Sequence, residues 1–150
     1  MSRKLEFEMV PDGCWYVNLR SHYSKKDWDV IRLDAKNRAN GKCMICGRKT
    51  ERLEAHEKWS YDEKKAVQKL EDVVSICHDC HSVIHIGRTQ LLGNTEKAEN
   101  HYMKVNGVSY SEMRKDLGVA NEIHKRRNLI SEWITDISLA ENILKKYKKE

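Results

Sequence analysis

The sequence predicts an α+β protein in which a small metal-stapled core of two strands and one helix is flanked by α-helices. Two Cys-x-x-Cys pairs, at 43/46 and 77/80, mark this core. Hydrophobic residues at 39%, charged residues at 34% and a single proline are typical of a water-soluble, helix-rich protein. We expect a single domain over 1–150, with an N-terminal helical flank at 1–42, the core at 43–87 and a C-terminal helical region at 88–150.

The N-terminal flank is predicted to contain one substantial helix. Residues 1–22 are expected to be irregular or partly extended, with a turn at Pro11-Asp12-Gly13. Ser24 is a suitable N-cap, and a helix ending near Asn40-Gly41 follows from the spacing of Trp28, Ile31, Ala35 and Ala39.

The core is predicted to be a hairpin followed by a helix. Residues 43–58 have the pattern of a short hairpin, and 60–71 that of a polar loop. Residues 73–76 are apolar. A helix is expected to begin after Cys77, to carry His85 and to end near Gly87.

The C-terminal region is predicted to be helical. Helices are expected at 96–105 and 110–117, with Gly118 separating the second from another that begins near Ala120. The stretch 109–127 therefore resembles a helix-turn-helix unit. An amphipathic helix is predicted at 131–148 from the spacing of Trp133, Ile137, Ala140, Leu144 and Tyr147.

The four paired cysteines predict a structural zinc site. Cys43, Cys46, Cys77 and Cys80 provide the four thiolates of a tetrahedral zinc shell. Four unrelated buried thiols would require two coincidental Cys-x-x-Cys motifs. Because a closed four-thiolate shell leaves no position for a substrate, this zinc should join the hairpin to the helix. Cys14 is left outside the site.

Three histidines predict a second metal site beside the first. If a helix begins near Cys80, His81 and His85 lie four residues apart on one of its faces, at a spacing that lets two imidazoles share one ion. His56 would join them from the strand opposite.

Residues 43–87 resemble the HNH endonucleases. The segment Leu53-Glu54-Ala55-His56-Glu57 is similar to the strand of that family, and Cys77-x-x-Cys80-His81-x-x-x-His85 to its helix. The resemblance implies a ββα-metal, treble-clef-like core and metal-dependent hydrolysis of DNA phosphodiester bonds. It also implies that His56, His81 and His85 hold a divalent cation such as Mg²⁺, Mn²⁺, Ni²⁺ or Zn²⁺.

Two positions depart from the pattern of that family. Glu57 stands where the family has the histidine that acts as general base, and Asp72 stands where it has asparagine. An ionised Asp72 accepts hydrogen bonds but donates none. Glu57 has three interpretations: a general base weaker than histidine, a fourth metal ligand that closes the shell, or a surface carboxylate. Neighbouring strand residues point to opposite faces, so either of the first two interpretations requires a bulge next to His56.

Charge and hydropathy indicate the partners. The net charge of +5 and the basic runs at 25–26, 125–127 and 145–149 permit contact with phosphates, so DNA is the expected partner of the nuclease. The alternative is a catalytically impaired zinc-binding module that binds nucleic acid or a protein partner as an adaptor or inhibitor. The short apolar stretches and the absence of a signal region predict a cytoplasmic protein with no membrane contact.

Overall fold

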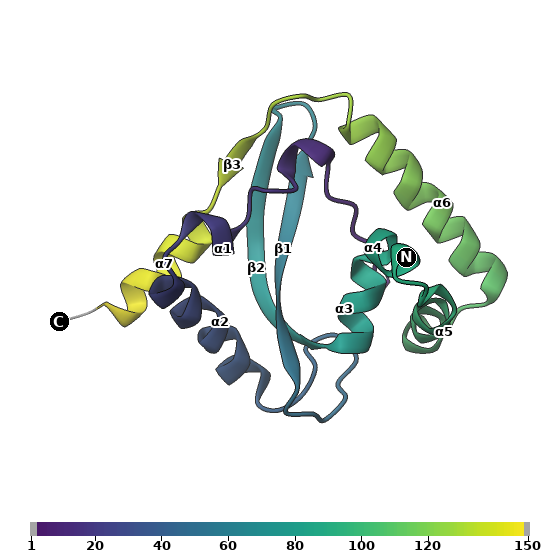
Figure 1. The fold of residues 1–150 in the computed structure, drawn as a ribbon, viewed down its shortest axis with the longest axis horizontal. Coiled ribbons are helices and arrows are strands. Elements are labelled where there is room, and N and C mark those ends of the chain that lie inside the picture. Colours follow the sequence, from purple (N-terminus) through teal and green to yellow (C-terminus); the bar gives the residue numbers. More distant parts are fainter. Residues whose placement is uncertain (1–2, 149–150) are drawn as a thin grey trace.

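The computed structural model describes residues 3–148 and is built around a long β-hairpin (Figure 1). Strand β1 (Leu53–Asp62) pairs antiparallel with β2 (Val67–Cys77), and the short β3 (Ile134–Asp136) pairs parallel with β2 at residues 67–69. In the described residues the sheet has the order β1-β2-β3. The α+β class predicted from the sequence is confirmed.

The hairpin is longer than the sequence predicted, and the polar loop expected at 60–71 was wrong. Strand pairing continues to Asp62 and Val67, with Trp59 opposite Leu70 and a bulge after Lys58. Leu70 is buried in a cluster with residues of two helices, whereas Lys69 and Glu71 are exposed. The polar residues are therefore the solvent-facing half of a strand whose other half is covered.

Helix α2 (Lys25–Ala39) follows a 3₁₀ turn, η1 (Asp12–Cys14), and one short helix, α1 (Leu19–His22). The Ser24 hydroxyl accepts a hydrogen bond from the Asp27 backbone N–H, and Asn40 ends the helix in the left-handed conformation at φ 53°. The predicted bounds of this helix are confirmed.

The helix after the second cysteine pair is interrupted at His85. Helix α3 (His78–Ile84) ends there, and α4 (Ile86–Leu91) begins on its other side. His85 has φ −98° and ψ 53°, outside the helical region. The prediction that one helix carries both His81 and His85 was therefore wrong at His85, although the break keeps the two side chains close.

The C-terminal region differs from the prediction at two places. Helix α5 (Thr95–Asn106) is followed by one continuous helix, α6 (Tyr110–Arg127), so Gly118 separates nothing and no helix-turn-helix forms within 109–127. Burial of Leu117 and Ala120 on one side keeps the helix intact across the glycine. The helix expected at 131–148 divides into β3 and α7 (Ser138–Tyr147), because the Ile134 N–H donates to the Ala66 carbonyl and starts a strand.

The hairpin stands between two groups of helices (Figure 1). Helices α2 and α7 pack with Leu70 and Val73 of β2, while α3, α5 and α6 share a second buried cluster with Leu5 and Phe7 of the N-terminal segment. In the described part of the chain, no helix is both long and apolar enough to cross a bilayer.

Candidate metal centre

The four paired cysteines meet where the loop before β1 approaches the start of α3. Their sulfur atoms lie within 4.8 Å of one another, and Cys46 Sγ is 3.8 Å from Cys77 Sγ. Two sulfurs on one tetrahedral zinc are about 3.8 Å apart, because each Zn–S bond is about 2.3 Å. The arrangement therefore fits a zinc ion.

Electrostatics at the cysteines also favours a cation. The hydrogen bond from Cys80 lowers the pKa of the Cys43 thiol to about 4, whereas burial raises the pKa of Cys77 to about 11. One thiolate is stabilised at the expense of its neighbours, so four thiolates in this space need a positive ion. Backbone N–H groups of Ile45 and Cys80 point at Cys43 and Cys77.

His101 also contacts this cluster, although no spacing in the sequence links it to the cysteines. Its Nε2 lies 3.2 Å from Cys80 Sγ, on helix α5. A ring N–H directed at a thiolate stabilises its negative charge, as residues around a metal shell commonly do. Cys80 lies on α3 and His101 on α5, with α4 between them in the chain, so only tertiary packing brings the two residues together.

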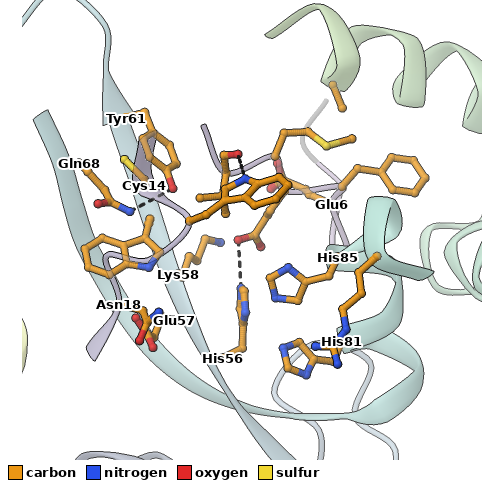
Figure 2. Close-up of a pocket in the computed structure, with 18 of the residues that line it drawn as sticks. Glu6, Cys14, Asn18, His56, Glu57, Lys58, Tyr61, Gln68, His81 and His85 are labelled. Atoms are coloured by element: carbon orange, nitrogen blue, oxygen red, sulfur yellow. Dashed lines mark hydrogen bonds and ion pairs between the residues drawn. The ribbon is translucent and has the colours of Figure 1, made fainter. Parts of the chain in front are cut away.

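The three predicted histidines converge beside the hairpin (Figure 2). Ring nitrogens of His56 on β1, His81 on α3 and His85 at the α3–α4 break lie within 4.8 Å of one another. The ring centroids are 4.9 to 5.5 Å apart. This is a group of imidazoles gathered around one small volume, as the sequence predicted.

His81 and His85 are held in the neutral form that binds metals. Burial lowers the pKa of His85 to about 3, and burial also lowers the pKa of His81. A neutral imidazole keeps a free lone pair for an ion. Glu54 Oε1 accepts a hydrogen bond from Nδ1 of His81 at 2.7 Å, which leaves Nε2 of that ring as its possible ligand atom.

A carboxylate from the N-terminal segment reaches the same histidines. Glu8 Oε1 lies 3.0 Å from His56 Nε2. Figure 2 draws a dashed line from the ring of His56 for this contact. The two residues are 48 positions apart, and Glu8 is not among the residues predicted for the site. An isolated glutamate in an irregular segment carries no motif that would have marked it.

Glu57 lies apart from the three histidines. Its Oε1 accepts a hydrogen bond from the Leu19 N–H at 3.0 Å, and Figure 2 shows it beside Asn18. Burial raises the pKa of this carboxyl group. The bulge of β1 does not lie next to His56 but two residues further on, after Lys58, so His56 and Glu57 keep regular strand pairing and Glu57 is not turned towards His56. Glu57 therefore caps the first turn of α1.

Asp72 also lies away from the histidines. Its Oδ1 accepts a hydrogen bond from the Val73 N–H at 2.7 Å and is 3.6 Å from Nη2 of Arg38 on α2. It does not line the cleft that the histidines line. Asp72 therefore lies outside the cleft of the candidate ligands, whereas Glu57 lines that cleft but is not part of the histidine group.

The histidines open into a cleft of about 690 Å³ beside the hairpin. Aromatic and basic side chains share its wall with them, and the indole N–H of Trp15 donates to the Val10 carbonyl at 3.1 Å within it. The basic residues of this cleft are Arg3, Arg20, Lys58, Arg88 and Arg127. Four carboxylates share the wall with them, those of Glu6, Glu8, Glu57 and Asp116, and Asp116 is paired with Arg3. The cleft is therefore lined by charges of both signs.

No protein-family model, curated protein or solved structure matches this chain. The chemistry assigned to the site therefore follows from its residues and their geometry.

Proposed function

We propose that this chain is a metal-dependent DNA endonuclease of the HNH type, with a structural zinc at the four cysteines and one divalent cation at the three histidines. The observation that carries the proposal is the convergence of His56, His81 and His85 within 4.8 Å beside a fitting four-cysteine site. The ligands of both groups come from the hairpin β1-β2, the loop before it and helix α3 with its C-cap His85.

The chain's own residues hold the ion and direct it into the cleft. His56 is only 5% exposed, so its ring has little freedom to turn away. His85 is placed at the site by the end of α3. Glu54 fixes the third ring, that of His81. A divalent ion bound there would supply Lewis-acid stabilisation of charge on a scissile phosphate and its leaving oxygen.

Basic side chains of the cleft would bind the DNA backbone. Lys58 follows His56 on β1, and Arg88 follows His85 on α4, so each lies near a candidate ligand along the chain. Both are exposed, as phosphate contacts must be. Contacts of this kind depend on charge and not on base identity, so the proposed activity is largely independent of sequence.

Glu57 is the candidate general base that would activate the attacking water. In this proposal its carboxylate would have to leave the Leu19 N–H before it could accept a proton from water. The raised pKa of Glu57 moves it towards the value that suits a general base at neutral pH.

The hydrogen bond between the Glu57 carboxylate and the Leu19 N–H favours a second candidate function. A zinc-stapled module that has kept the metal-binding scaffold but lost its base would bind nucleic acid or a protein partner without turnover. In that case Glu57 serves the fold, by satisfying the first N–H of α1, and the histidine site binds metal without cutting.

A plasmid-nicking assay separates the two candidates. Wild type is incubated with Mg²⁺, Mn²⁺, Ni²⁺ or Zn²⁺ and compared with His81→Ala, Glu57→His and the control His22→Ala, which alters an exposed histidine outside the cleft. Cleavage that is lost in His81→Ala and kept in the control supports the enzyme. Absence of wild-type cleavage with all four metals contradicts the enzyme, and DNA binding by the same inactive protein supports the module.

A further inference from the structure

The N-terminal segment presents the Glu8 carboxylate to His56, one of the three histidines. Its residues alternate: Leu5 and Phe7 are buried in the cluster beneath α5 and α6, while Glu6 and Glu8 line the cleft. Of these two carboxylates, only Glu8 contacts a candidate ligand, through the 3.0 Å approach of Oε1 to His56 Nε2.

Glu8 is held in place by its neighbours. The backbone N–H of Glu8 donates to the Ile84 carbonyl at 3.1 Å, directly before His85 in the chain. Leu5 exchanges two hydrogen bonds with the Asn106 side chain, at 3.0 and 2.9 Å. The Phe7 ring stacks on Tyr102 with centroids 4.2 Å apart. The segment is thus fixed at Leu5, Phe7 and Glu8, which holds the Glu8 carboxylate at the histidine site.

Among residues 3–148, no lysine or arginine balances the charge of the Glu8 carboxylate. Within residues 3–148, no lysine or arginine nitrogen lies within 4.0 Å of its carboxylate, and His56 is its one ion-pair partner. Asp116, another partly buried carboxylate, is by contrast paired with Arg3. A carboxylate and three imidazoles that share a cleft wall are a donor set for a divalent cation.

We propose that Glu8 is a fourth protein ligand of the metal ion held by His56, His81 and His85, an inference that rests on the metal site of the proposed function. Two donors on one ion, each about 2.1 Å from it, are about 3.0 to 3.4 Å apart, which the Glu8–His56 distance matches. Glu8 contacts His56 alone among the three rings, so its carboxylate would move towards His81 and His85 as the ion binds.

This assignment makes the N-terminal segment part of the active site. The ion would join three parts of the chain: β1 through His56, the α3–α4 junction through His81 and His85, and the segment through Glu8. A carboxylate added to three neutral imidazoles lowers the net charge of the bound ion and favours harder cations than imidazoles alone would. Ions that take six ligands would keep two positions for phosphate or water.

Cobalt titration of the zinc-loaded protein tests the proposal without any cleavage assay. Co²⁺ added to protein that already holds zinc at the cysteines reports on the histidine site through its visible absorption. Glu8→Gln keeps the shape of the side chain and removes its charge, Glu8→His replaces one donor with another, and Glu6→Gln is the matched control on the same face of the segment. Retention of zinc and of the thermal midpoint shows that each variant is folded.

Glu8→Gln is expected to lower Co²⁺ affinity by at least about 10-fold and to change the position and intensity of the absorption bands. Glu8→His should recover most of the affinity, and Glu6→Gln should match wild type. Unchanged affinity in Glu8→Gln overturns the proposal, as does weaker binding with an unchanged spectrum, which would make Glu8 a partner of His56 and not a ligand. Wild type that binds no Co²⁺ overturns the histidine metal site itself, and with it the proposed function.

If Glu8→Gln does not fold, the Glu8→His variant still decides the matter. A histidine ligand in place of the carboxylate shifts the absorption of bound Co²⁺ relative to wild type, and an identical spectrum overturns the assignment.

Discussion

The Glu54 carboxylate accepts a hydrogen bond from Nδ1 of His81 across 2.7 Å, joining strand β1 to helix α3. This contact fixes the tautomer of the ring and leaves Nε2 available on the side of His56 and His85. A carboxylate that accepts from a metal-binding imidazole also raises the basicity of the ligand nitrogen. Glu54 is therefore a positioning residue for the proposed site, although it lies outside the ligand set.

Removal of the Glu54 carboxylate should weaken the histidine site. Glu54→Ala is expected to lower the affinity for a second divalent ion by about 10- to 100-fold, because His81 loses the partner that orients it. The measurement is Co²⁺ titration of the zinc-loaded protein. Glu51→Ala, an exposed glutamate just before β1, is the control and should bind as wild type does. Equal affinities in all three proteins would contradict the positioning role.

Loss of the cysteine site should unfold the core. The variant Cys43→Ser with Cys46→Ser is expected to purify without tightly bound zinc and with reduced secondary structure. Structural zinc contributes apparent binding free energies of about 10–16 kcal/mol, as large as the whole stability of a typical domain. Elemental analysis and circular dichroism measure the two effects. Cys14→Ser, at a buried thiol outside the cluster, should keep its zinc. A double variant with the wild-type thermal midpoint would refute the structural role.

Glu57 should make the stability of the protein depend on pH. Burial raises its pKa in the folded state above the ordinary value of about 4.3, so its contribution to stability is complete below that value and is lost as the pH rises through the folded pKa. Glu57→Gln keeps an acceptor for the Leu19 N–H and removes the titration. Its free energy of unfolding, measured in urea from pH 4 to pH 8, should therefore rise relative to wild type as the pH increases.

A companion variant separates charge from hydrogen bonding at the same position. Glu57→Ala leaves the Leu19 N–H without its acceptor and should cost about 1–3 kcal/mol at every pH in that range. A wild type that gains stability over Glu57→Gln with rising pH would show that the ionised carboxylate is favoured in the fold, contrary to the assigned cause.

Gly118 should tolerate a side chain, because α6 is continuous and nothing lies within 4 Å of an added Cβ. Gly118→Ala is expected to raise the free energy of unfolding by about 0.5–1 kcal/mol through the higher helix propensity of alanine. Gly107→Ala is the opposite case, since Gly107 ends α5 with φ 64°, where a side chain is strained. Chemical denaturation of both variants measures the contrast. A destabilised Gly118→Ala would indicate a helix break at that position.

Sequence spacing was sufficient for the two candidate sites because ligand geometry is local. A Cys-x-x-Cys turn places two sulfurs on one ion whatever surrounds it, and His81 and His85 stay close even though the helix breaks between them. Helix α2 was equally predictable, since Ser24 and Asn40 mark its ends through their own backbone contacts.

Elements whose form depends on distant partners could not be predicted in this way. Most of the segment at 60–71 is strand because α2 and α7 cover Leu70. Ile134–Asp136 is strand because it pairs with the free edge of β2 at residues 67–69. A polar stretch or an amphipathic spacing is compatible with several local structures, and burial by another part of the chain selects among them.

The sequence by itself determined the two groups of potential ligands, four cysteines and three histidines, since the two Cys-x-x-Cys pairs and the spacing of His81 and His85 are recognisable motifs. The long hairpin brings the first cysteine pair and His56 to the other members of each group. Only the tertiary structure decided which carboxylates stand beside them. It brought Glu8 and Glu54 to the histidines and gave Glu57 to the N-terminus of α1. The physical reason is that a carboxylate has no characteristic spacing to its partner, so its role depends on the surface that folding places within reach of its oxygens.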